Sequence, residues 1–227
     1  MSCTSDIHQA LADKDLLPSL HLVDAGYIDA QLLVQSQQEH RIDLFGPTRI
    51  NPSWQAREGG FDTTLFVIDW DNQRVTCPQG KVSRWWNISA PQSGPHGDQP
   101  GRVKASFSRQ DCGPCAKRAK CVRSNAGRAR GVMLPLREHY EALLQVRTAI
   151  ATPEGQREYQ PRAGVEGTLS QGIRRCGLRH TRYRGLAKTH LQHVATAVPL
   201  NVMRTVNHLQ EKPLAKTRQS RFARLTA

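Results

Sequence analysis

The chain has 227 residues, which is enough for one or two domains with a buried core. Apolar residues make up 38% of it, and no run approaches the roughly 18 apolar residues that a membrane-spanning helix needs. The N-terminal residues lack a basic start followed by an apolar run, so we expect neither a secretory signal nor a membrane location, but a cytoplasmic protein. The formal net charge of +13 indicates a polyanionic partner.

The charge is divided unequally along the chain. Residues 1–101 carry 7 Lys and Arg against 12 Asp and Glu, whereas residues 102–227 carry 25 against 7. An acidic half followed by a strongly basic half is typical of a protein whose C-terminal part lies on nucleic acid. Charge alone leaves two readings open, a DNA enzyme and a basic binding protein without chemistry.

Residues 1–50 have the pattern of an α/β segment. A short apolar run at 19–23 predicts a buried strand that delivers Asp24 at its C-terminal end. Residues 28–40 have helical spacing, and 42–45 form a second apolar run closed by Gly46 and Pro47. Strand, helix and strand in this order predict a parallel pair of strands.

Residues 51–125 predict a small, mostly β insertion. Runs at 63–70 and 74–77 flank Asp71 and Asn72, which predicts a hairpin, and 103–107 predicts a further strand. Residues 89–101 are rich in Gly and Pro, so we expect a loop there. Trp85 and Trp86 are expected in the core or rim of this insertion, with stacking on bases as the alternative.

Four of the six cysteines fall in this insertion, namely Cys77, Cys112, Cys115 and Cys121. Two thiolates separated by two residues bind one Zn²⁺ from a tight turn, and two more complete a tetrahedron. A small insertion with few apolar residues would need such a site to fold, and the site would be structural. The alternative is four reduced, unliganded thiols, as we expect for Cys3 and Cys176.

Residues 126–210 are predicted to be largely helical. Helical spacing covers 136–150, and Thr152 followed by Pro153 indicates the start of the next helix. Leucines and valines between 186 and 209 predict a core-facing helix, which Pro199 should kink or split. The basic residues 211–227 are expected to be a disordered tail.

A single acid stands among many cations between residues 159 and 188. Glu166 is followed by Arg174, Arg175, Arg179, Arg182, Arg184 and Lys188. Such a carboxylate is most often a structural ion-pair partner. The alternative is a hard-oxygen site for Mg²⁺ or Mn²⁺ formed with Asp24, beside cations that hold DNA phosphates.

The segment YQPRAGVE at 159–166 resembles the signature of DDE transposases from bacterial insertion sequences, in which a Tyr, an Arg and the catalytic Glu recur on one helix. The glycine- and arginine-rich residues that follow are similar to the same family's C-terminal block. Residues 22–27 are similar to the motif that carries the second catalytic Asp, and a cysteine-bearing insertion fits a subgroup of the family.

This resemblance implies a partial RNase H-like fold, a mixed sheet flanked by helices and interrupted by the insertion. It implies cleavage and strand transfer of an element's DNA ends with two divalent ions held by Asp24 and Glu166. Arg162 would contact a phosphate, and Tyr159 would position DNA or the helix that bears the Glu. The implied partners are double-stranded DNA, at the element ends and the target, and further copies of the chain in a synaptic complex at the bacterial nucleoid.

The sequence departs from the family pattern at two points. The Lys expected seven residues after the Glu is replaced by Ile173, with Arg174 beside it. The family's first catalytic Asp has no place before Asp24. We therefore interpret the chain as the C-terminal part of a truncated transposase and expect no strand transfer by it alone. The alternatives are a catalytically dead, zinc-stapled DNA-binding remnant and a basic RNA-associated protein.

Overall fold

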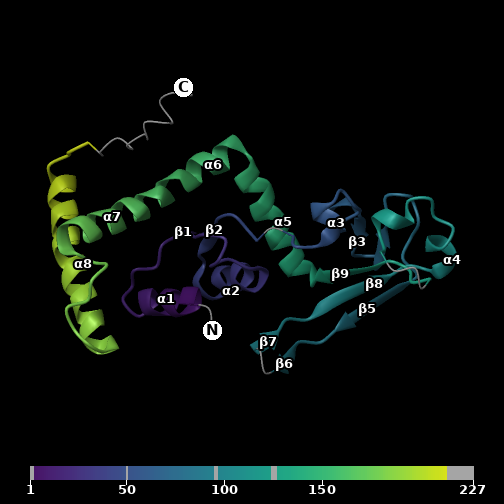
Figure 1. Ribbon diagram of the computed structural model, residues 1–227, viewed down its shortest axis with the longest axis horizontal. Helices are drawn as coiled ribbons and strands as arrows, with labels where there is room; N and C mark the ends of the chain where they lie inside the picture. The colour runs from purple at the N-terminus through teal and green to yellow at the C-terminus, as the bar shows by residue number, and fades with distance from the viewer. Residues whose placement is uncertain (1–2, 50, 95–96, 124–126, 214–227) are drawn as a thin grey trace. The chain divides into compact units, whose positions relative to one another are not determined.

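The computed structural model describes residues 3–49, 51–94, 97–123 and 127–213 (Figure 1). The chain divides into two units, Met1–Gln160 and Pro161–Ala227, and each is described by itself. Helices and short strands alternate in the first unit, and the second is helical where it is described. The predicted α/β fold class is confirmed.

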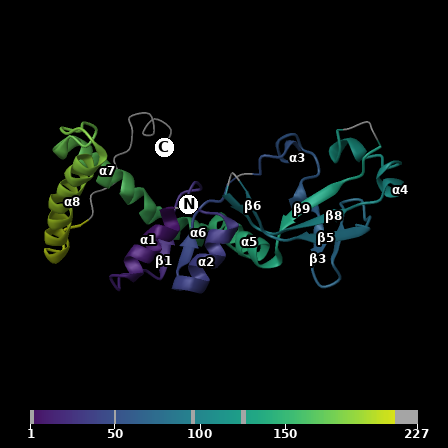
Figure 2. The ribbon, with the colours of Figure 1, turned by 90° about the horizontal axis from the view of Figure 1, so that it is seen from below.

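The first unit contains the predicted strand, helix and strand. These are β1 (Leu20–Leu22), α2 (Ala30–His40) and β2 (Asp43–Phe45), and the two strands pair in parallel. Asp29 begins α2 by accepting a hydrogen bond from the Leu32 N–H at 2.9 Å. A further helix, α1 (Cys3–Ala12), packs beside α2 (Figure 2).

Histidines join α1 to this α/β pair. His8 is almost fully buried, and its Nε2 lies 2.8 Å from Nδ1 of His21 on β1. The ring of His40 at the end of α2 lies edge-on to the His8 ring, at 5.7 Å between centroids. Burial lowers the pKa of His8, and the neighbouring His21 and His40 lower it further, so the ring is held neutral.

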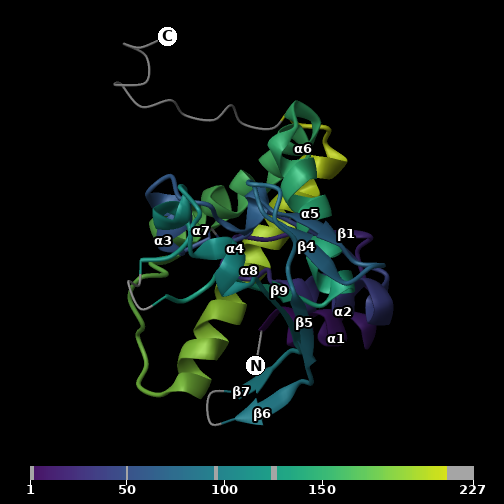
Figure 3. The same cartoon turned by 90° about the vertical axis from the view of Figure 1, so that its right-hand side faces the viewer.

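The insertion contains the predicted hairpin and a three-stranded antiparallel sheet. The hairpin is β3 (Val67–Asp69) with β4 (Arg74–Thr76). The sheet has the order β5 (Trp85–Ser89), β8 (Arg102–Ser106) and β9 (Gly131–Pro135), which Figures 1 and 2 label. Figure 3 shows β5 and β9 from another side. Short helical turns flank these strands, namely α3 (Trp54–Arg57), η1 (Thr63–Leu65), α4 (Arg109–Cys112) and η2 (Arg118–Lys120).

The loop predicted at 89–101 is wrong, because this segment contains β6 (Gln92–Gly94) and β7 (Gly97–Gln99). The two strands pair in antiparallel fashion beyond the end of β5 and β8. The breakers Pro91 and Pro100 flank the ladder and do not interrupt it, so it loses no hydrogen-bond donor to them. Residues 95–96 lie outside the described residues.

Two clusters of buried side chains hold the first unit together, and one helix belongs to both. The insertion cluster consists of Phe66, Val75, Val103, Ala105, Phe107, Val132 and Leu134. The α/β cluster consists of Val23, Ile28, Leu32, Leu33 and Leu44. Helix α5 (Arg137–Ala151) packs Tyr140 against the first and Leu143 and Val146 against the second. The insertion and the α/β pair are therefore connected through α5.

The second unit is built from α7 (Gly164–Cys176) and α8 (Leu186–Leu209), which pack on each other. Helix α8 runs through Pro199 unbroken, so the predicted split is not seen; a proline removes a single N–H donor, and the neighbouring turns keep theirs.

The prediction that the apolar stripe of α8 faces a core is also wrong. Leu186 is 90% exposed, and Val198 and Val202 are more than half exposed. The buried side chains of α8 are instead Thr196 and Leu200, because this is the face that meets α7, near Gly172. The predicted disordered tail falls mainly on residues 214–227, which lie outside the described residues.

Candidate active site and cysteine cluster

Asp24 stands immediately beyond the parallel strands. The Val23 N–H donates to the Phe45 carbonyl at 2.9 Å, which extends the pairing of β1 and β2 by one residue. The Asp24 carbonyl then accepts from the Tyr27 N–H at 2.9 Å and closes a turn. The carboxyl ends of parallel strands are where ligands bind in open α/β sheets, so Asp24 has the position that the sequence predicts for a functional acid.

Gly46 allows the backbone after β2 to approach the Val23 carbonyl closely, next to Asp24. A Cβ at this position would lie 1.9 Å from the Val23 carbonyl oxygen, which no side chain can tolerate. The same Cβ would lie 3.5 Å from the Tyr159 ring. A glycine directly after the second strand therefore sets the position of the Val23–Asp24 peptide.

Tyr159 donates a hydrogen bond to the Asp24 carboxylate. It ends α6 (Pro153–Tyr159), which Thr152 caps by accepting from the Gly155 N–H at 3.0 Å. The Tyr159 hydroxyl lies 3.0 Å from Asp24 Oδ1 and 3.3 Å from the Val23 carbonyl oxygen. The sequence predicts that Tyr159 positions DNA or the helix that bears Glu166, whereas its contact with Asp24 emerges only from the structure.

Glu166 lies in the first turn of α7, where Arg162 pairs with it. Arg162 donates a hydrogen bond to the Glu166 carboxylate from one turn earlier in the chain. This bond lowers the pKa of Glu166 below its ordinary value, because it stabilises the ionised carboxylate. The Glu166 side chain is 60% exposed, and Arg162 itself is largely buried, with 18% of its side chain exposed.

The predicted single helix bearing Tyr159, Arg162 and Glu166 is wrong. Tyr159 ends α6, Arg162 lies in the 3₁₀ turn η3 (Gln160–Ala163), and Glu166 lies in α7. Pro161 has no N–H to continue the α-helical ladder, which accounts for the tighter turn. Asp24 belongs to the first unit and Glu166 to the second, so the convergence of the two carboxylates stays a prediction.

The predicted DNA-binding cations follow Glu166 on an exposed stretch. Arg174 and Arg175 end α7, Lys188 begins α8, and the segment between the two helices carries Arg179, Arg182 and Arg184. All six side chains are exposed. Ile173, which takes the place of the family's Lys, is partly buried, whereas Arg174 is exposed.

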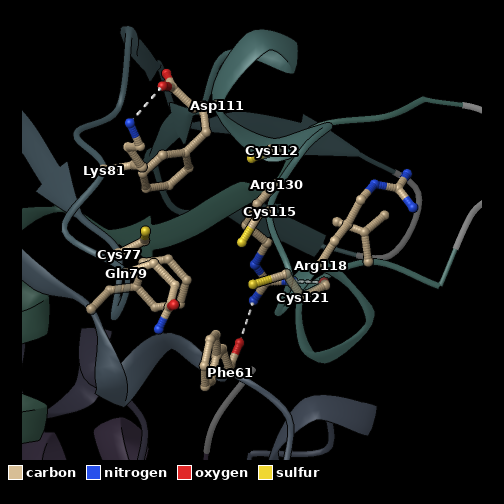
Figure 4. A pocket seen from close by; sticks show the side chains of 13 residues that line it. Phe61, Cys77, Gln79, Lys81, Asp111, Cys112, Cys115, Arg118, Cys121 and Arg130 are labelled. Atoms are coloured by element: carbon tan, nitrogen blue, oxygen red, sulfur yellow. Dashed lines mark hydrogen bonds and ion pairs between the residues drawn. The ribbon is translucent and has the colours of Figure 1, made fainter.

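The four insertion cysteines line one cavity (Figure 4). Cys77 follows β4 in a tight turn in which the Gly80 N–H donates to the Cys77 carbonyl at 2.9 Å. Cys112 ends α4, Cys115 follows it, and Cys121 comes directly after η2. Figure 4 shows their sulfur atoms directed toward the same space. The structure thus brings together all four cysteines that the sequence singles out.

Arg130 closes one side of this cavity. Its guanidinium donates to the carbonyls of Cys121 and Phe61, each at 3.3 Å. Burial raises the pKa of the Cys121 thiol, and the nearby Cys77, Cys112 and Cys115 raise it further, against the influence of Arg130. As the side chains stand in the described ranges, no three or more His, Cys, Asp or Glu residues form a group that could hold a metal ion.

A family model described as a transposase DDE domain matches residues 76–206, more than half of the chain. The chain belongs to the transposase DDE domain family. The match includes the four cysteines, Tyr159, Arg162 and Glu166, and it begins after Asp24. This confirms the family that the sequence motifs indicate. No curated protein and no solved structure matches the chain. Among the described residues of the transposase, no helix combines the length and apolarity needed to cross a membrane.

Proposed function

We propose that this transposase chain serves the cleavage and joining of DNA ends by divalent-metal-dependent phosphoryl transfer, with Asp24 and Glu166 as metal ligands. The hydrogen bond from Tyr159 to Asp24 is the observation that carries this proposal. Tyr159 contacts Asp24 and lies only seven residues before Glu166 in the chain. The substrate is double-stranded DNA.

The residues present fit a hard divalent cation. Both side chains offer carboxylate oxygens, the ligands that Mg²⁺ and Mn²⁺ prefer. When bound, such ions activate the attacking oxygen and stabilise the leaving oxygen of the phosphodiester. The protein's own part is to present the ligands: Tyr159 orients Asp24, and Arg162 orients Glu166 through their hydrogen bond.

The exposed cations between Glu166 and α8 suit the phosphate backbone of the substrate. An Arg guanidinium binds a phosphate through two parallel hydrogen bonds, which fixes position as well as charge. We propose that Arg174, Arg175, Arg179, Arg182, Arg184 and Lys188 grip DNA beside the metal ligands. Arg162 then has two parts, as partner of Glu166 and as contact to a phosphate near the scissile bond.

We also propose that Cys77, Cys112, Cys115 and Cys121 bind one structural Zn²⁺. The support is that all four thiols line one cavity and that only two residues separate Cys112 from Cys115. Four thiolates fill the tetrahedral shell of Zn²⁺ and leave no open position for catalysis. The zinc would stabilise the insertion and take no part in phosphoryl transfer.

Metal-dependent DNA binding tests the proposed active site. We expect Mn²⁺ to tighten the binding of the full chain to a 30-base-pair duplex by about tenfold, a usual size of coupling between two ligands. Asp24→Asn and Glu166→Gln should each abolish this gain and leave metal-free binding intact. Binding is measured by fluorescence anisotropy with and without Mn²⁺.

Glu154→Gln is the matched control, because Glu154 is an exposed acid that pairs with Arg157 on α6. This variant should keep the full effect of Mn²⁺. If Mn²⁺ does not change the DNA affinity of the wild type, or if it tightens DNA binding by Glu166→Gln as much as by the wild type, the chain is a DNA-binding protein without a catalytic metal site.

A further inference from the structure

The three-stranded sheet of the insertion has a second face that the proposed active site does not use. Along β8, Val103 and Ala105 are buried in the insertion core, while Arg102 and Lys104 between them are exposed. Along β9, Met133 is 57% exposed between two buried residues. Because successive residues of a strand point to opposite faces, the exposed side chains share one face.

The pairing register shows which side chains are neighbours on this outer face. Lys104 lies between Asn87 of β5 and Met133 of β9, and Arg102 lies opposite Ser89. Trp85 lies two residues before Asn87, so it points to the same face, and it is 49% exposed. We call this set the insertion face: Trp85, Asn87, Arg102, Lys104 and Met133.

The insertion face is positive and carries no compensating acid. None of the residues in β5, β8 and β9 is acidic. The Arg84 guanidinium lies 5.3 Å from the centre of the Trp85 ring, where cation and ring attract each other. In the described part of the chain, Arg84, Arg102 and Lys104 form no ion pair, whereas Arg137 near the same sheet pairs with Asp71 and Glu141.

We propose that the insertion face is a second binding surface for double-stranded DNA. This inference rests on the proposed function, which makes DNA the substrate. Alternate residues of a strand are about 7 Å apart, so Arg102 and Lys104 present two charges at a spacing comparable to that of successive phosphates on one DNA strand. When two such cations neutralise DNA phosphates, counterions are released from the DNA, and this release favours binding.

The aromatic and polar residues add contacts that a purely electrostatic surface lacks. Trp85 and Met133 offer exposed apolar surface beside the cations, and Asn87 offers an amide between them. Trp85 held under Arg84 contacts the sugar and base edges next to the phosphates. An acidic protein could also bind these cations, but its carboxylates would not be spaced regularly like the phosphates of a DNA strand.

The test is the affinity of the full chain for a 30-base-pair duplex in a buffer without Mg²⁺, Mn²⁺ or chelator, so that bound zinc is retained, measured at several salt concentrations. For Arg102→Gln/Lys104→Gln we expect binding roughly tenfold weaker at low salt and a plot of log affinity against log salt whose slope is smaller by about two. Both side chains are exposed, so the fold should survive, and Lys104→Gln alone should give about half of the change in slope.

The matched control is Lys14→Gln/Arg57→Gln, which removes two exposed cations of the same unit that lie outside the sheet. It should weaken binding less than about threefold, as expected for a loss of distant charge. In addition, DNA should quench the tryptophan fluorescence of the wild type, and Trp85→Phe should lose most of this quenching.

The outcomes separate this inference from the proposed function. If the sheet variant and the control lose affinity equally, or if duplex DNA and an acidic polypeptide bind the face equally well, the insertion face is not a DNA surface. If the wild type binds no DNA at all, the proposed function fails with it. Because these assays contain no Mg²⁺ or Mn²⁺, a failure of the Asp24 and Glu166 proposal would leave the result for Arg102 and Lys104 unchanged.

Discussion

Replacing Cys112 and Cys115 together by serine should unfold the insertion around the cysteine cavity. The wild-type chain should be purified with one Zn²⁺, and the double variant should hold less than about a tenth of that amount, because two of four ligands are lost. EDTA should have the same effect on the wild type. Zinc is counted by mass spectrometry of the metal, and the fold is followed by near-ultraviolet circular dichroism of the tryptophans.

The physical reason is the small number of apolar contacts in the segment that bears these cysteines. Neither α4 nor η2 buries a side chain fully, and Cys112 of α4 packs only partly buried against the insertion core. Structural Zn²⁺ contributes on the order of 10 kcal/mol in small zinc domains, which is more than such a segment can supply by packing. Loss of the ion should therefore remove the order of the segment.

Cys3→Ser/Cys176→Ser is the control, because Cys3 is exposed on α1 and Cys176 ends α7, both outside the cavity. This variant should keep its zinc and its fold. A wild-type chain that stays metal-free after refolding with Zn²⁺, yet keeps the spectrum of a folded insertion, would show that the four thiols are unliganded.

Gly46→Ala should destabilise the chain by about 3 kcal/mol or more, at the upper end of the cost of overpacking. The added Cβ would lie 1.9 Å from the Val23 carbonyl oxygen, so β1 and β2 cannot keep their pairing. Because Asp24 follows Val23, the carboxylate should move away from Tyr159, and the effect of Mn²⁺ on DNA binding should be lost with it. Urea unfolding measures the stability.

Gly26→Ala is the matched control, since Gly26 lies two residues after Asp24 and a Cβ there would have no heavy atom within 4 Å. It should change the free energy of unfolding by less than about 1 kcal/mol. If Gly46→Ala proves as stable as Gly26→Ala, the close approach of residue 46 to the Val23 carbonyl does not exist in solution.

The elements with strong local signals could be predicted from the sequence. The parallel strands follow from two apolar runs around a helix, and the hairpin of β3 and β4 follows from the turn at Asp71 and Asn72. The cysteine cavity was predictable because thiols at zinc-binding spacing are rare by chance. In the first two cases, the residues that decide the structure lie close together in the chain, and in the third the paired spacing of Cys112 and Cys115 gives the signal.

What the sequence could not show depends on residues far apart in the chain or on the surroundings of an element. The contact of Tyr159 with Asp24 joins positions 135 residues apart, and no local pattern reports it. The hairpin of β6 and β7 forms because β5 and β8 bring its ends together, which outweighs its Gly and Pro content. The valines of α8 are exposed because the helix packs on α7 through Thr196 and Leu200 instead.

Cleavage of the protein by bound iron tests most directly whether Asp24 and Glu166 hold the same ions. Fe²⁺ in place of Mg²⁺, with ascorbate and peroxide, generates radicals that cut the backbone next to the bound ion. We predict two cuts in the full chain, one beside Asp24 and one beside Glu166, and both cuts should vanish in Asp24→Asn and equally in Glu166→Gln. A single cut, beside only one of the two acids, would show that the two carboxylates do not form one site. The same would follow if Asp24→Asn lost only the cut beside position 24 and Glu166→Gln only the cut beside position 166.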